Sequence, residues 1–122
     1  MNRPEQELQR AVVQVLTYAA VPGLVWYAVP NGGWRSKTEA AIFAGLGVKP
    51  GVGDFAIVLP GGRAAFLELK SAKGTLSDAQ LEFRAACVAT GALWGMARDI
   101  DEAIEVLRSW GAVRIGGRGR AA

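Results

Sequence analysis

Two short apolar runs joined by a glycine-rich turn constrain the fold of this chain most. The runs are 55–59 (FAIVL) and 64–69 (AAFLEL), and Pro60-Gly61-Gly62-Arg63 connects them. A Gly-Gly pair between two such runs predicts a β-hairpin, because glycine adopts positive φ angles at no steric cost. We therefore expect an antiparallel pair of strands at the centre of the chain.

The hairpin brings two acidic side chains close together. A register without a bulge pairs Asp54 with Leu69, whereas a one-residue bulge beside the glycines pairs Asp54 directly with Glu68. Directly opposed Cβ atoms are about 4.5–5.5 Å apart, so either register brings the two carboxylates within reach of one metal ion. Lys70 follows Glu68 by two residues and lies on the same face of the strand.

The run AAFLELK is apolar except at Glu68 and Lys70, which is typical of a strand covered on both faces. Two buried carboxylates without a partner are unfavourable, so one takes up a proton or a cation binds. An isolated Glu-x-Lys on a strand is more often an ordinary cross-strand ion pair. Here Asp54, one hairpin away behind a glycine-rich turn, favours the metal site.

Composition narrows the possible chemistry. The chain has 122 residues, the size of one domain, and contains no histidine and a single cysteine, Cys87. The absence of histidine excludes histidine acid–base catalysis, Ser-His and Cys-His nucleophiles and most transition-metal sites. One cysteine excludes an internal disulfide and a cysteine-rich zinc site. Catalysis would have to use carboxylates, lysine and a hard cation.

Charge and hydropathy bear on partners and location. The net charge of +3 fits a nucleic-acid partner. No apolar run reaches the roughly 18–20 residues that span a bilayer, and MNRPEQELQR lacks a signal-peptide core. We expect no membrane partner and a cytoplasmic location, in a bacterial or phage-infected host cell. Residues 1–112 are expected to form one domain, followed by a basic, disordered tail at 113–122.

The pattern of the chain predicts an α/β fold. Its order is helix, strand, short helix, strand, strand, helix, strand, helix, and the helix between the last two strands favours a parallel crossover. This order predicts a mixed central β-sheet flanked by helices. Besides the hairpin strands, the expected elements are a helix at 4–20, a strand at 24–29, a helix at 39–44, a helix from 78 to 90, a strand at 93–97 and a helix at 99–110.

Local signals mark the starts of two helices. Thr38 is expected to cap the short helix. Ser77 and Gln80 form the capping-box pattern Ser-x-x-Gln. Leu81, Phe83 and Cys87-Val88 are expected to form the apolar face of the helix that follows.

Two loops carry candidate nucleic-acid contacts. Trp34, Arg35 and Lys37 follow a glycine-rich turn, and they suit either phosphate and base contacts or an ordinary surface loop. Lys73, in the loop after the second hairpin strand, is either a DNA-backbone contact or a solvated lysine. The sequence leaves both alternatives open.

Taken together, these motifs resemble the PD-(D/E)xK nuclease superfamily, and within it the VRR-NUC family, in particular its phage-type stand-alone proteins. The match spans nearly the whole domain in the right order, although Gly53 stands where the family often has a proline. The residues that carry it are 5–8 (EQEL), 30–33 (PNGG), 50–54 (PGVGD), 68–70 (ELK), 74–77 (GTLS) and Gln80.

The resemblance implies a restriction-endonuclease-like fold and a Mg²⁺ or Mn²⁺ cofactor. Asp54, Glu68 and the carbonyl oxygen of Leu69 would hold the ion. Glu5 would add a carboxylate from the first helix, with Glu7 as the alternative. These oxygen ligands are the type that Mg²⁺ prefers.

The resemblance also assigns catalytic roles. Lys70 would orient or deprotonate the attacking water, or stabilise charge on the phosphorane. Gln80 would hold a water, Lys70 or a phosphate oxygen. Ser77, at the same helix N-terminus, would lie beside a phosphate.

The function implied is a metal-dependent DNA endonuclease that selects branched DNA, such as Holliday junctions, and acts as a homodimer. The alternative from another class is a non-catalytic DNA-binding accessory protein that retains the nuclease fold. A small protein with a structural metal fits less well, because structural sites usually recruit Cys or His.

Overall fold

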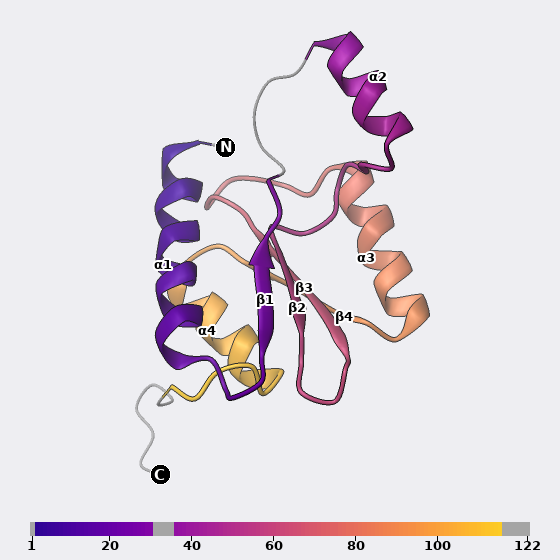
Figure 1. The fold of residues 1–122 in the computed structure, drawn as a ribbon. Helices are drawn as coiled ribbons and strands as arrows, with labels where there is room; N and C mark the ends of the chain where they lie inside the picture. The colour runs from indigo at the N-terminus through magenta and orange to yellow at the C-terminus, as the bar shows by residue number, and fades with distance from the viewer. Residues whose placement is uncertain (1, 31–35, 116–122) are drawn as a thin grey trace.

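Four strands form one mixed sheet in the computed structural model, which describes residues 2–30 and 36–115 (Figure 1). β1 and β2 are antiparallel, as are β2 and β3, whereas β3 and β4 are parallel. The predicted mixed sheet is confirmed. The strands lie in the order β1 (Val25–Ala28), β2 (Phe55–Val58), β3 (Ala64–Leu69) and β4 (Leu93–Ala97).

Helices flank the sheet in the predicted order. In Figure 1, α1 and α4 lie on one side of the strands, α3 lies on the other, and α2 stands beyond the end of the sheet. No helix within the described ranges is long and apolar enough to cross a membrane. The helices are α1 (Arg3–Ala19), α2 (Lys37–Gly45), α3 (Asp78–Thr90) and α4 (Ile100–Ser109).

Of the two predicted registers, the hairpin adopts the one that includes a one-residue bulge. Phe55 pairs with Leu67, and beyond the strand ends the Leu59 N–H donates to the Arg63 carbonyl at 2.9 Å. Gly61 and Gly62 in the connecting loop have φ angles of 99° and 94°. Such angles favour glycine, so this turn sets the register that the site depends on.

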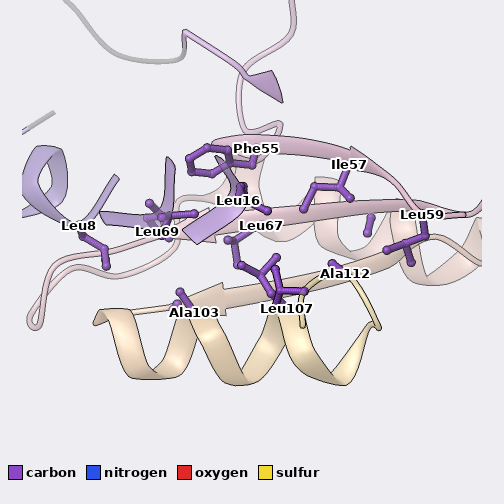
Figure 2. Packing of buried hydrophobic residues seen from close by; sticks show 14 residues of the cluster. Leu8, Leu16, Phe55, Ile57, Leu59, Leu67, Leu69, Ala103, Leu107 and Ala112 are labelled. Atoms are coloured by element: carbon purple, nitrogen blue, oxygen red, sulfur yellow. The ribbon is translucent and has the colours of Figure 1, made fainter. Parts of the chain in front are cut away.

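One face of the sheet is the hydrophobic core. Figure 2 shows Ala103 and Leu107 on the side of α4 that faces the strands, and they belong to the same buried cluster as the core-facing side chains of β2 and β3. Because side chains alternate along a strand, the even-numbered residues of β2 and β3 face the opposite side. The core therefore fixes the two strands that carry the candidate carboxylates. Its fully buried large side chains are Val12, Leu16, Phe55, Ile57, Leu67, Leu69 and Leu107.

The start of α2 differs from the prediction. Its N-cap is Ser36, not Thr38: the Ser36 hydroxyl accepts from the Glu39 N–H, and the Glu39 carboxylate accepts from the Ser36 N–H, both at 3.1 Å. This reciprocal capping box satisfies two backbone donors, which a cap at Thr38 would not do. None of the residues of α2 is buried.

The helix α3 begins at the predicted box and ends at Gly91, but its apolar face is narrower than expected. Cys87 is buried, and the Phe83 ring meets Phe66 edge-on with centroids 5.0 Å apart. Leu81 and Val88 are 39% and 71% exposed, so their assignment to the packed face was wrong. The helix contacts the sheet mainly through β4, which leaves those side chains in solvent.

The chain returns to α1 near its end. Val113 forms an isolated antiparallel bridge with Ala20, and the Arg114 N–H donates to the Ala19 carbonyl at 2.8 Å. Val113 is buried, so the folded part extends past residue 112, where the domain was expected to stop. Most of the expected tail, residues 116–122, lies outside the described residues.

Candidate active site

Two carboxylates lie opposite each other where β2 begins and β3 ends. Continued by one residue, the register Phe55–Leu67 sets Asp54 across from Glu68. Their exposed fractions are only 5% and 4%. Among the buried residues of the described chain these two are the polar ones, so the fold places two acidic side chains together inside.

Each carboxylate has a specific donor. The Leu69 N–H donates to Asp54 Oδ2 at 2.7 Å, and Gln80 Nε2 donates to Glu68 Oε2 at 2.9 Å. Lys70 Nζ lies 3.7 Å from the same Glu68 oxygen. The predicted convergence of two acids and an amine is present in the structure.

Burial raises the pKa of Glu68 from 4.5 to about 8, and the Asp54 carboxylate adds to the rise. The Lys70 ammonium acts in the opposite direction, and Glu5 raises the pKa further. Removing a carboxylate from water disfavours its charged form, and a neighbouring like charge does the same. At neutral pH Glu68 therefore holds a proton unless a cation offsets the negative charge.

Glu5, from the first turn of α1, reaches this end of the sheet. Its Oε2 atom accepts from the Ser71 N–H at 3.0 Å, across 66 positions of sequence. Glu5 is half-buried and acts electrostatically on Glu68, whereas Glu7 is exposed. Of the two alternatives on the first helix, Glu5 is the one at the site.

The Gln80 side chain caps the start of α3 and also contacts the carboxylate pair. Its Oε1 accepts from the Ser77 N–H at 2.8 Å, and the Ser77 hydroxyl accepts from the Gln80 N–H at 3.2 Å. This capping box directs the remaining amide hydrogens to Glu68. The N-terminus of α3 is thereby tied to the carboxylate pair.

The carboxylates open into a cleft of about 400 Å³. Phe43 of α2 forms part of its apolar wall, and Lys49 and Pro50, from the segment before β2, also line it. Neither Phe43 nor Lys49 was predicted as a site residue. The sequence could have indicated Lys49, because it directly precedes the Pro50–Asp54 motif. Nothing in the sequence of α2 indicated that Phe43 lines the site. Asp54, Glu68 and Gln80 supply the polar wall.

Three of the predicted nucleic-acid contacts lie within the described residues, on three different segments of the chain. Lys73 is exposed in the turn after β3, and Lys37 is exposed in the first turn of α2. Ser77 is the exposed N-cap of α3. Trp34 and Arg35 lie outside the described residues.

The donor set suits a hard divalent cation. Within residues 2–30 and 36–115, no three Asp, Glu, His or Cys side chains form a metal-binding group. Mg²⁺, however, keeps several waters and typically takes one or two carboxylates together with substrate phosphates. The buried pair Asp54 and Glu68 therefore fits Mg²⁺ or Mn²⁺ without a third acidic ligand.

Comparison with known proteins identifies the fold. No protein-family model matches the sequence, and no curated protein does either. A solved structure described as a VRR_NUC domain protein superposes with a TM-score of 0.72 at 22% identity, covering 94% of this chain and 99% of that one. The chain has the fold of a VRR-NUC domain. A second solved structure, described as a VRR_NUC domain, gives a TM-score of 0.62 at 14% identity, over 89% and 99% of the two chains.

Within this VRR-NUC fold, Gly51 lets the loop before β2 press against α3. A Cβ atom there would lie 2.5 Å from the backbone carbonyl of Ala79 and 2.8 Å from the Gln80 nitrogen, and the φ angle is +82°. The loop that carries Asp54 and the helix that carries Gln80 are thus in direct backbone contact.

Gly51→Ala is therefore expected to destabilise the protein by more than the roughly 1–3 kcal/mol of backbone strain alone. Gly47→Ala is the matched control, because Gly47 has a φ of +91° but nothing within 4 Å of its Cβ position. Urea unfolding of both variants measures the difference. Equal losses in the free energy of unfolding would show that the contact with α3 has no energetic weight.

Proposed function

We propose that this chain is a Mg²⁺- or Mn²⁺-dependent nuclease of the VRR-NUC family that hydrolyses phosphodiester bonds in DNA. The observation that carries the proposal is the buried pair Asp54 and Glu68 on adjacent strands, with the Lys70 amine 3.7 Å from Glu68. A binding protein has no need to keep two like charges buried at a cost to its stability. A hydrolase that binds a cation needs such a pair, because the carboxylates hold the ion.

In the proposed site, Asp54, Glu68 and the carbonyl oxygen of Leu69 hold the cation. Glu5 contributes a further carboxylate, directly or through water. A bound divalent ion makes water more acidic and neutralises charge on the phosphate. Asp54 is already fixed for this role by the Leu69 N–H, and Glu68 is fixed by Gln80.

Other side chains of the chain would activate the water, stabilise charge and contact the DNA. Lys70 orients or deprotonates the attacking water, or stabilises negative charge as it develops on the phosphate. Gln80 and Ser77 place the N-terminus of α3, which favours anions, next to the carboxylates. Lys73 and Lys37, both exposed, contact the DNA backbone.

Trp34 and Arg35 belong to the same proposal, as a base-stacking and a phosphate contact. The resemblance to VRR-NUC proteins extends the proposal to branched DNA, such as a Holliday junction, and to a homodimer. Light scattering in solution tests the homodimer separately from the chemistry.

Labelled four-way junction, flap and linear duplex DNA, each incubated with Mg²⁺, Mn²⁺ or EDTA, test the proposed function. We expect cutting with either metal, none in EDTA, and faster cutting of the branched substrates. Cleavage that persists in EDTA contradicts metal dependence. A protein that binds these DNAs in every condition and cuts none would instead be a non-catalytic accessory.

Lys70→Ala is expected to lower the cleavage rate by about 10²-fold or more, because it removes the proton-transfer or charge-stabilising group. DNA affinity and its salt dependence should change little. Lys73→Ala is the matched control: it should weaken binding and flatten the salt dependence, while cutting at saturating DNA persists. A Lys70→Ala protein that cuts at the wild-type rate would remove the lysine from the mechanism.

A further inference from the structure

The turn that follows β3 is held by an arginine from the end of β4. The turn is closed by a hydrogen bond from the Gly74 N–H to the Ser71 carbonyl at 3.1 Å. Arg98 Nη1 donates to the Ser71 carbonyl at 2.8 Å and to the Gly74 carbonyl at 2.7 Å, with the Ala72 carbonyl at 3.4 Å. One nitrogen atom thus contacts carbonyl groups at both ends of the turn.

The same turn borders the Lys70 side chain. A Cβ atom on Gly74 would lie 3.4 Å from Lys70 Cδ and 3.2 Å from Ser71 Oγ. The Lys70 N–H donates to the Ala97 carbonyl at 3.0 Å, one residue before Arg98. The end of β4 thus holds Lys70 through the backbone and holds its neighbouring turn through the Arg98 side chain.

The turn also holds the carboxylate of the first helix. The Ser71 N–H donates to Glu5 Oε2, while the Ser71 carbonyl accepts from Arg98. One peptide segment therefore connects Arg98 to Glu5 on one side and to Lys70 on the other. A shift of the turn would move both groups relative to Asp54 and Glu68.

We propose that Arg98 is a positioning residue of the active site, which acts by holding the Ser71–Gly74 turn so that Lys70 and Glu5 stay aimed at the carboxylate pair. The inference rests on the proposed nuclease function. A guanidinium presents several donors in a fixed planar arrangement, which suits it to hold several carbonyls at once. Displacing a catalytic group by about 1 Å can cost about 10²-fold in rate.

Arg98→Gln and Arg98→Lys test the proposal on the full chain. We expect Arg98→Gln to lower kcat at saturating DNA by about 10–100-fold, since the turn beside Lys70 and Glu5 is displaced. KM for DNA should rise no more than in Lys73→Ala, because Lys73 lies in the same turn. Arg98→Lys should recover part of the loss, because an ammonium can still donate to some of the carbonyls. Arg108→Gln is the matched control: it removes the same charge from α4, where Arg108 pairs with Glu105.

Hydrogen exchange of the Ser71 amide in EDTA gives a readout that is independent of activity. It should be faster in Arg98→Gln than in the wild type and unchanged in Arg108→Gln. Gly74→Val places a side chain against Ser71 Oγ and Lys70 Cδ, so it should disturb the same turn and lower kcat with Arg98 intact.

Wild-type kcat in Arg98→Gln would overturn the proposal, whatever the kcat of Gly74→Val. So would a loss fully explained by a smaller folded fraction, with no recovery in Arg98→Lys. A wild-type protein that cuts no DNA rejects the proposed function instead. In that case faster exchange of the Ser71 amide in Arg98→Gln still supports the inference that Arg98 holds the Ser71–Gly74 turn, and unchanged exchange overturns it.

Discussion

Asp54→Asn is expected to abolish Mg²⁺-dependent cleavage, with a loss of about 10³-fold or more, equivalent to at least about 4 kcal/mol of transition-state stabilisation. Asparagine has nearly the shape of aspartate and can still accept the hydrogen bond from the Leu69 N–H. The fold should therefore persist. What disappears is the negative charge that attracts the cation to the end of β2.

Single-turnover cleavage of the best substrate, together with thermal unfolding with and without Mg²⁺, measures this effect. A ligand that binds only the folded protein raises the unfolding temperature, so Mg²⁺ should stabilise the wild type and not Asp54→Asn. Glu82→Gln, an exposed change on α3, is the control and should behave like the wild type. Wild-type cutting by Asp54→Asn would exclude the carboxylate pair as the metal site.

The second large effect concerns stability. Glu68→Gln is expected to make the metal-free protein more stable at alkaline pH, by several kcal/mol with about 5 kcal/mol as the upper limit. The pKa of Glu68 is raised from 4.5 to about 8, by burial first and by Asp54 second. The folded state therefore holds a proton that the unfolded state loses, and a neutral glutamine avoids this difference.

Proton linkage gives the direction in which wild-type stability changes with pH. Below about pH 4.5 the carboxyl is protonated in both states and contributes nothing unfavourable. Between about pH 4.5 and 8 the unfolded state releases its proton first, so wild-type stability falls as the pH rises, and above about 8 the loss is complete.

Urea unfolding in EDTA at pH 5 and pH 8.5 should show this fall in the wild type and a much smaller one in Glu68→Gln. The same variant should lose metal-dependent cleavage, so a gain in stability would accompany a loss of activity. Glu82→Gln should keep the wild-type slope. An identical pH dependence in the wild type and Glu68→Gln would mean that Glu68 is not electrostatically strained.

Much of the fold could be predicted because its signals are local. The glycine pair at 61–62 specifies the hairpin, and the Ser77–Gln80 box specifies the start of α3. The strand at 93–97 and the order of the elements are as predicted. Even the incorrect cap at Thr38 had a local remedy, since Ser36 and Glu39 already formed a Ser-x-x-Glu pattern.

The candidate site was predictable in its centre and not at its edges. Asp54 and Glu68 meet because one turn sets the register of two adjacent strands. The choice of Glu5 over Glu7 depends on how α1 packs, and the exposure of Leu81 and Val88 depends on how little of α3 the sheet covers. The pattern of apolar residues cannot show either of these.

By itself, then, the sequence determined the hairpin, its acidic pair, the amine two residues beyond and the order of helices and strands. Only the tertiary structure decided which helix carboxylate reaches the site, that the free amide of Gln80 turns to Glu68, and that Arg98 holds the turn beside Lys70. The physical reason is the range of the interactions. Caps and turns satisfy backbone groups within about four residues, whereas these contacts join distant segments that meet only when the core has packed.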